Sequence, residues 1–91
     1  MKFKNKAAAD IEAGIVSKGI PADVFRSARR KMELLMSACS LNDLRVPPGN
    51  RLEALKGDRE GQYSIRVNDQ FRFCFKFVNG EAEEIEFVDY H

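Results

Sequence analysis

The sequence contains no tryptophan, a single histidine and only two cysteines, and these shortages exclude several kinds of site. A structural zinc centre needs a cluster of His or Cys ligands, which this composition does not supply. Cys39 lies in a helical pattern and Cys74 in a strand pattern. With no export signal in the sequence, we expect both cysteines to be reduced packing residues rather than the two halves of a disulfide.

Long apolar runs are also missing. The longest uninterrupted runs are three or four residues, whereas a membrane-spanning helix needs about 20. The first lysines are followed by Ala7–Ala9 but by no apolar stretch of the signal-peptide type. We therefore expect a cytoplasmic protein with no membrane partner. A length of 91 residues predicts one domain, residues 1–91, with a single core.

The net charge of +1 carries little information, but the charges are unevenly distributed. Residues 1–43 carry a net +3 and residues 44–76 another +3, whereas residues 77–91 contain five acidic side chains and no Lys or Arg. A polyanionic partner would therefore meet the middle of the chain rather than its acidic end.

Two helices are predicted in the first half of the chain. Residues 7–18 place apolar side chains at helical spacing, with Gly14 inside the segment and Gly19 suited to end it in a left-handed cap. A second, stronger helix is predicted from about Ala22 to Ala38, with Pro21 in its first turn. We expect the two to form a hairpin. The residues expected to face the core are Ala8, Ile11, Ile15, Val16, Val24, Phe25, Ala28, Met32, Leu35, Met36 and Cys39.

The second half predicts strands, because apolar and polar residues alternate over residues 63–67, 71–77 and 85–87. Residues 2–4, a phenylalanine between two lysines, suit a short edge strand. The sequence therefore predicts an α+β fold in which two N-terminal helices pack on one face of a small, mainly antiparallel β-sheet.

The phenylalanines predict how the strands pair. A three-residue loop at residues 68–70 pairs Ile65 with Phe73. For the next turn, Asn79-Gly80 suits a two-residue hairpin. That register, however, sets two glutamates on the phenylalanine face, at a cost on the order of several kcal/mol if they are buried unpaired. We therefore predict a three-residue loop, residues 79–81, which pairs Phe73 with Phe87.

The other face of this predicted sheet is cationic. Arg66 lies directly across from Arg72, and like charges in that position destabilise a sheet, so we expect carboxylates or an anionic ligand nearby. One interpretation is a solvated face. The other is a phosphate-handling site, because arginine forks fit phosphate geometry. Cleavage of a phosphodiester also needs an acid and a base, and the candidates are Glu53, Asp89, Tyr90 and His91.

Three segments resemble the HigB branch of the RelE/ParE toxin superfamily. They are RLEALKGDREG at residues 51–61, SIRVNDQFR at residues 64–72 and the closing DYH at residues 89–91. The resemblance extends over residues 44–91, and in the helical half it rests on length and element order. It implies a RelE-like fold and the toxin of a type II toxin–antitoxin system that uses no metal or other cofactor.

Such toxins are typically ribosome-dependent mRNA endonucleases, or mRNA interferases, in which the ribose 2′-OH attacks the adjacent phosphate. The resemblance implies three partners: a cognate HigA-like helix-turn-helix antitoxin, the ribosome with its mRNA, and operator DNA through the antitoxin complex only. Carried over by position, Lys56 and Arg72 match phosphate-binding and charge-stabilising residues, and Asp89, Tyr90 and His91 match the catalytic C-terminus. The full set expected to contact RNA phosphates is Arg51, Lys56, Arg66 and Arg72, of which Arg66 comes from the register alone.

Glu53 departs from the family pattern, because well-known members carry a histidine at this position. Glu53 is either the general base or a salt-bridge partner that orders the arginines, which leaves proton transfer to His91. Two other functions stay open. One is a non-enzymatic gyrase inhibitor of the ParE kind, and the other is an attenuated toxin that acts mainly within a repressing antitoxin complex.

Overall fold

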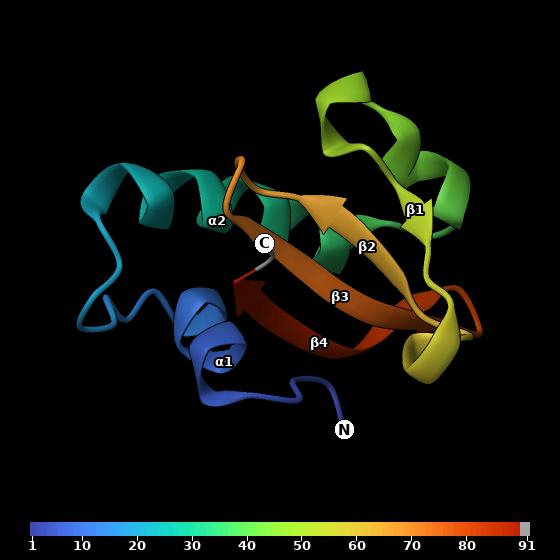
Figure 1. Ribbon diagram of the computed structural model, residues 1–91, viewed down its shortest axis with the longest axis horizontal. Helices are drawn as coiled ribbons and strands as arrows, with labels where there is room; N and C mark the ends of the chain where they lie inside the picture. The colour runs from blue at the N-terminus through green and yellow to red at the C-terminus, as the bar shows by residue number, and fades with distance from the viewer. Residues whose placement is uncertain (90–91) are drawn as a thin grey trace.

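The computed structural model describes residues 1–89, in which two α-helices precede a four-stranded sheet (Figure 1). The sheet is antiparallel, with the strand order β1-β2-β3-β4. This arrangement confirms the predicted α+β fold. The elements are α1 (Lys6–Ala13), α2 (Ala22–Ser37), the 3-10 turns η1 (Leu41–Arg45) and η2 (Pro48–Asn50), β1 (Glu53–Ala54), the 3-10 turn η3 (Gly57–Arg59), β2 (Tyr63–Arg66), β3 (Phe71–Val78) and β4 (Glu81–Asp89).

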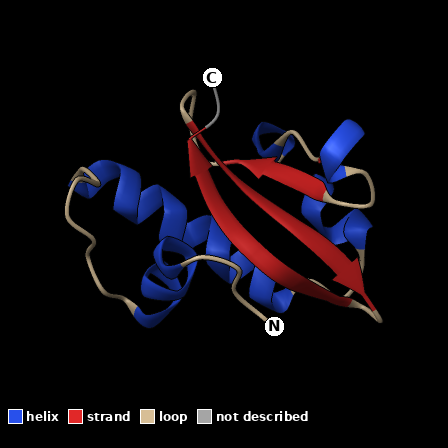
Figure 2. Cartoon of the chain, turned by 60° about the horizontal axis from the view of Figure 1, so that its bottom comes forward, coloured by secondary structure: helices blue, strands red, loops and turns tan. Residues whose placement is uncertain are grey.

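The helices close one face of the sheet and enclose the core. α2 lies across that face, and α1 packs against α2 and β4 (Figures 1 and 2). Phe73, Phe75 and Ile85 of the sheet and Ile11 and Met32 of the helices are fully buried, each contributing about 1.5–3 kcal/mol. Neither α1 nor α2 covers the opposite face, which carries Arg66 and Arg72. Within residues 1–89, no helix has the length and apolar character needed to cross a bilayer.

α1 ends earlier than predicted. Gly14 rather than Gly19 forms its C-cap, with a left-handed φ of 80° and its N–H directed at the carbonyls of Asp10 and Ile11. The chain leaves the helix there, so Ile15 and Val16 are 55% and 64% exposed. The prediction that these two residues face the core is wrong, because a left-handed glycine satisfies the last carbonyls of the helix and turns the chain away.

α2 matches its predicted bounds to within one residue, and Val24, Ala28, Met32 and Leu35 are buried as expected. The apolar stripe is narrower than predicted at its end. Met36 is 42% exposed, and Cys39 lies beyond the helix and is exposed, so neither is a core residue. Pro21 is the N-cap of α2 rather than a residue of its first turn.

The β2–β3 register agrees with the prediction. Ile65 pairs with Phe73 and Arg66 with Arg72. Asn68 shapes the three-residue loop, since its Oδ1 accepts from the backbone N–H of Gln70 (2.9 Å) and of Phe71 (2.7 Å). This side-chain bridge is the ordinary way in which asparagine builds a turn.

The β3–β4 turn is a two-residue hairpin and not the predicted three-residue loop. Val78 pairs with Glu81, and the two turn residues Asn79 and Gly80 both have positive φ, 51° and 80°, as such tight hairpin turns require. The predicted three-residue loop is therefore wrong.

A β-bulge in β4 nevertheless restores the predicted apolar pairing. Lys76 pairs with Glu83, the register then shifts, and Cys74 pairs with Glu86 and Phe73 with Phe87. Glu84, with a φ of 49°, occupies the bulge. Two residues of β4 therefore oppose one of β3, which exchanges the faces of the rest of the strand.

The N-terminal segment lies along the outer edge of β4. Phe3 forms a parallel bridge with Ile85, where the predicted edge strand is reduced to one residue. The Lys4 N–H donates to the Ile85 carbonyl (2.7 Å), and the Ile85 N–H donates to the Lys2 carbonyl (2.9 Å). The edge of β4 is therefore paired at this point.

Candidate functional site

On the face that α1 and α2 leave open, the register sets one residue from each strand in a row. Glu53 of β1 pairs with Ser64 of β2, Ser64 with Cys74 of β3, and Cys74 with Glu86 of β4. Side chains at directly paired positions lie on the same face. The row therefore has a carboxylate at each end, with a fully buried hydroxyl and a fully buried thiol between them.

Arg72 reaches back from the next position of β3 toward this row. Its Nη1 donates to Ser64 Oγ (2.9 Å) and its Nη2 donates to Glu53 Oε1 (3.1 Å). The Arg72 side chain is only 13% exposed, whereas Glu53 is 53% exposed. The guanidinium is thus held from two sides near the surface of the sheet.

Arg66 faces Arg72 across the strand pair, but the two guanidiniums turn to different carboxylates. Arg66 pairs with Asp69 in the β2–β3 turn, and Arg72 pairs with Glu53 of β1. The carboxylates expected from the like-charge pair are therefore present. Because Glu53 and Asp69 are half exposed and fully exposed, each ion pair contributes only about 0–1 kcal/mol.

Arg59 fastens the β1–β2 connection onto the same face. Its Nη1 donates to Glu86 Oε1 of β4 (2.9 Å) and to Gln62 Oε1 (3.1 Å). Cys74 lies next to Glu86 in the row of paired residues. Burial raises the pKa of its thiol, and the Arg59 charge opposes this effect only in part. Cys74 therefore stays a protonated, free thiol, as expected of a reduced cysteine.

Lys56 and Arg51 lie on the segments that flank β1. Lys56 immediately precedes η3, and its carbonyl accepts from the Arg59 N–H (3.3 Å). Arg51 ends η2 in a left-handed conformation with a φ of 46°. Both side chains are exposed, and within the described residues neither forms an ion pair. Their charges are therefore open to an anionic ligand.

The structure does not bring every predicted residue to Arg72. Asp89 pairs with Phe71, which puts it on the phenylalanine face, and its Oδ2 accepts from Gln70 Nε2 (3.1 Å). Val88, not Asp89, is opposite Arg72. Tyr90 and His91, both predicted to be catalytic, lie outside the described residues.

Three residues of the site were not among the predicted site residues: Ser64, Arg59 and Glu86. The predicted register already placed Ser64 on the cationic face, so its role as an acceptor for Arg72 had a signal in the sequence. The separate prediction that Phe73 pairs with Phe87 likewise puts Glu86 across from Cys74. Arg59 had no such signal, because it sits in the turn of residues 56–61, where strand periodicity says nothing about direction.

The arrangement is suited to binding and polarising a phosphate. A guanidinium fixed by a hydroxyl and a carboxylate keeps its fork in one orientation, and fixed charge stabilises a developing oxyanion better than mobile charge does. Lys56 and Arg51 add positive charge on either side of β1. Among residues 1–89, no group of three or more His, Cys, Asp or Glu side chains is placed to hold a metal ion.

Two helices on one face of a small antiparallel sheet are the fold that the sequence resemblance led us to expect of a RelE-like toxin. The sequence profile of the family described as RelE-like toxin of type II toxin-antitoxin system HigB matches residues 2–91. The chain belongs to this family. Its partner is therefore an antitoxin.

Named relatives agree with this assignment. The chain is 48% identical to Toxin HigB-1 of Vibrio cholerae over 63 residues, which are 69% of this chain and 66% of that relative. It is 33% identical to Endoribonuclease HigB of Proteus vulgaris over 89 residues, or 98% of this chain and 96% of that relative. The second match includes both the helical half and the strands that carry the site.

Proposed function

We propose that this HigB-like toxin cleaves mRNA on the translating ribosome and thereby inhibits translation. The family match shows that the chain is a type II toxin, and the name of the Proteus vulgaris relative supports endoribonuclease activity. The dependence on the ribosome, the action in the cytoplasm and the roles of individual residues are our proposal.

One observation carries the proposed site: Arg72 is fixed between Ser64 and Glu53 on the face that the helices leave open. In the proposed reaction, the ribose 2′-OH loses its proton and attacks the adjacent phosphorus, while the 5′ oxygen leaves and takes up a proton. The products are a 2′,3′-cyclic phosphate and a 5′-OH. Arg72 stabilises the charge that develops on the phosphate oxygens during this attack.

Lys56, Arg66 and Arg51 bind the phosphates of the flanking nucleotides in this proposal. Such contacts give affinity without sequence preference and weaken as salt rises. The Arg59–Glu86 ion pair keeps the turn that begins at Lys56 against the sheet. The backbone at Lys56 is therefore held in place before RNA binds in this proposal.

Glu53 is a positioning residue for Arg72 in our proposal. Its Oε1 accepts a hydrogen bond from Arg72, and this contact orients the guanidinium that stabilises the phosphate. Proton transfer falls to Tyr90 and His91, to which the resemblance assigns it, whereas Asp89 pairs with Phe71 on the other face of the sheet and takes no part in it. The 2′-OH needs such a group within hydrogen-bond reach.

Primer extension on mRNA in a purified translation system tests the proposal. We expect cuts in mRNA on ribosomes, and few or none in the same mRNA without ribosomes. A DNA gyrase supercoiling assay serves as the parallel measurement for the ParE-like alternative. Inhibition of gyrase together with intact mRNA on ribosomes would show that the protein is a gyrase inhibitor instead.

The antitoxin partner is proposed to be a HigA-like helix-turn-helix protein, through which the toxin reaches operator DNA. Electrophoretic mobility shifts of the operator with toxin alone, antitoxin alone and both together test this point. We expect the toxin to change the shift only when the antitoxin is present. A shift with toxin alone contradicts the proposed route.

A further inference from the structure

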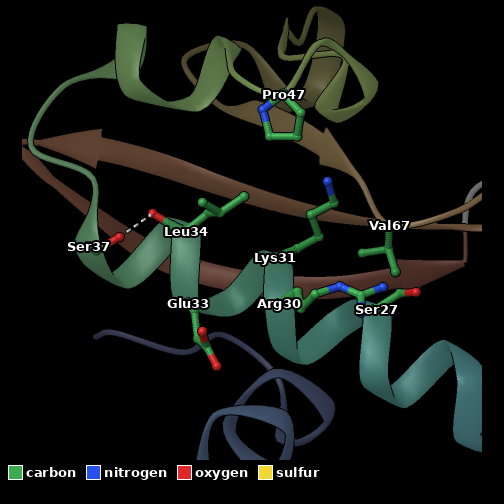
Figure 3. A pocket seen from close by; sticks show the side chains of 8 residues that line it. All are labelled: Ser27, Arg30, Lys31, Glu33, Leu34, Ser37, Pro47 and Val67. Carbon is green, nitrogen blue, oxygen red and sulfur yellow. Dashed lines mark hydrogen bonds between the residues drawn. The ribbon is translucent and has the colours of Figure 1, made fainter.

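An open groove of about 570 Å³ lies between α2 and the segment that leads into β1, with the end of β2 at one side (Figure 3). Leu34 of α2 and Val67, just past β2, point toward this space, and Pro47 stands across it. Val67 is buried and Leu34 half-buried. The groove therefore has an aliphatic floor rather than a fully polar one.

Two basic side chains, Arg30 and Lys31, line the groove beside these aliphatic residues. Figure 3 shows Lys31 extending from α2 toward Pro47, with Arg30 beside it; the lining also includes a carboxylate, Glu33. Within residues 1–89, neither Arg30 nor Lys31 forms an ion pair with a carboxylate. Burial lowers the pKa of Lys31, and the charges of Arg30 and Arg66 lower it further. An acidic group from a partner would relieve this concentration of positive charge.

Lys31 is held in place by a buried amide. Its Nζ donates to Asn50 Oδ1, and Asn50 Nδ2 donates in turn to the Leu44 carbonyl (3.1 Å). Asn50 is fully buried. The ammonium therefore has a fixed position in the groove, and a pre-organised charge loses less entropy on binding than a mobile one.

We propose that this groove binds an acidic segment of the antitoxin, with an apolar side chain on Leu34 and Val67 and carboxylates on Arg30 and Lys31. The inference rests on the family's antitoxin partner and not on the proposed cleavage of mRNA. A stable interface buries roughly 800 Å² on each partner, so the groove holds one anchoring part of a larger contact. Anchors of this kind carry a large share of the binding energy.

RNA fits the groove less well than an acidic polypeptide does. Single-stranded nucleic acid is usually held by aromatic stacking as well as by positive charge, and among the described residues no aromatic side chain lines the groove. The groove also opens on the helix side of the sheet. Val67 belongs to the hydrophobic core that the helices cover, so it faces away from the side that carries Arg72.

Binding of the purified toxin to the antitoxin encoded beside its gene tests the proposal by isothermal titration. Arg30→Glu should weaken the affinity at least tenfold, and Ser37→Glu, which adds a carboxylate to the groove without touching the core, should also weaken it. Arg26→Glu is the matched control, because it makes the same charge change on an exposed position of α2 outside the groove. Circular dichroism and thermal unfolding check that each variant is folded.

Binding of Arg30→Glu and Ser37→Glu within twofold of the wild type overturns the proposal. If these variants keep their antitoxin affinity but cleave mRNA on ribosomes more slowly, the groove belongs to RNA and the proposal is equally wrong. Loss of antitoxin affinity with unchanged cleavage is the expected result. The titration does not require a toxin that cleaves mRNA. Failure of the proposed cleavage can therefore be distinguished from failure of the proposed antitoxin groove.

A fluorescent label locates the contact directly. Ser37→Cys in a Cys39→Ser background offers one accessible thiol in the groove, since Cys74 is buried. Addition of the antitoxin should shift the emission of an environment-sensitive dye at this position to shorter wavelength. The same dye on Arg26→Cys should not respond. Tight antitoxin binding with no response at position 37 places the segment elsewhere and contradicts the proposal.

Discussion

Arg72 Nη2 lies 3.1 Å from Glu53 Oε1, so Glu53 is the direct partner of Arg72, the least exposed of the arginines that form ion pairs at the site. The pairing follows from the register. Glu53 is opposite Ser64, which accepts from the same guanidinium. A side chain in that position governs where the Arg72 fork points, whatever part it takes in proton transfer.

Replacement of Arg72 should separate charge from geometry. We expect Arg72→Ala to lower the single-turnover rate of mRNA cleavage on ribosomes by about 10²–10³, the usual effect of losing one oxyanion donor. Arg72→Lys keeps the charge but not the fork and should retain more activity. Because Ala leaves the buried Ser64 hydroxyl without this donor, a loss of about 1–3 kcal/mol in unfolding free energy is also expected. The variants are compared by their cleavage rates per folded molecule, with Arg26→Ala as the control. A rate for Arg72→Ala within threefold of the wild type would show that the phosphate site lies elsewhere.

The Glu53→Gln variant should distinguish a positioning role from a base. The amide oxygen still accepts a hydrogen bond from Arg72, so a positioning role predicts less than about a tenfold loss in rate and an unchanged rate–pH profile. A general base would instead lose about a hundredfold or more, together with the acidic limb of the profile. Rates measured from pH 5 to 9 for both forms decide between the two, and the second pattern would reverse our assignment of Glu53.

The Arg59–Glu86 pair should be recoverable by exchange of its charges. Arg59→Glu sets two carboxylates together and should destabilise the fold, whereas the Arg59→Glu, Glu86→Arg double variant should regain most of the loss. Because the two side chains are 36% and 20% exposed, we expect a coupling energy of about 0.5–1 kcal/mol. Urea unfolding of all four forms measures it. Additive single effects would show that the pair does not hold the turn that begins at Lys56.

Acid should weaken the contact that Asp10 makes with the α1–α2 connection. Hydrogen bonding from Lys6 lowers the pKa of Asp10, and a hydrogen bond from Ser17 acts in the same direction. A lowered pKa in the folded state means that the carboxylate stabilises the fold above its unfolded pKa, near 4, and that this contribution disappears as pH falls through the folded value. The stability difference between wild type and Asp10→Asn should therefore be present at pH 7 and shrink below about pH 4. An unchanged difference in urea unfolding at low pH contradicts the assignment.

The sequence predicted the site best where the register could be derived from apolar pairing. Ile65 with Phe73 fixed the relation of β2 to β3, and from it came the Arg66–Arg72 pair and the need for carboxylates nearby. The structure supplies them as Asp69 and Glu53. Alternation along strands was sufficient here because a slip of one residue exposes every phenylalanine.

Two predictions, the end of α1 and the β3–β4 loop, are wrong for the same physical reason. In each case more than one position in the sequence can adopt the required backbone conformation. Gly14 and Gly19 both suit a left-handed cap, and both have positive φ, but the helix ends at Gly14. At β3–β4, the apolar pattern correctly required Phe73 opposite Phe87 but did not say where the extra residue belongs. It is placed at Glu84, within the strand, and not in the turn.

We expect the short bridge between Phe3 and Ile85 to limit association of molecules through the edge of the sheet. An unpaired strand edge adds strands from other molecules and leads to aggregates. β1, at one border of the sheet, is only two residues long, and at the other border the Lys2 carbonyl and the Lys4 N–H occupy the backbone groups of Ile85. The first residues of the chain thus shield the toxin from polymerising through β4. A fusion or truncation that displaces them would cost solubility before it affected cleavage.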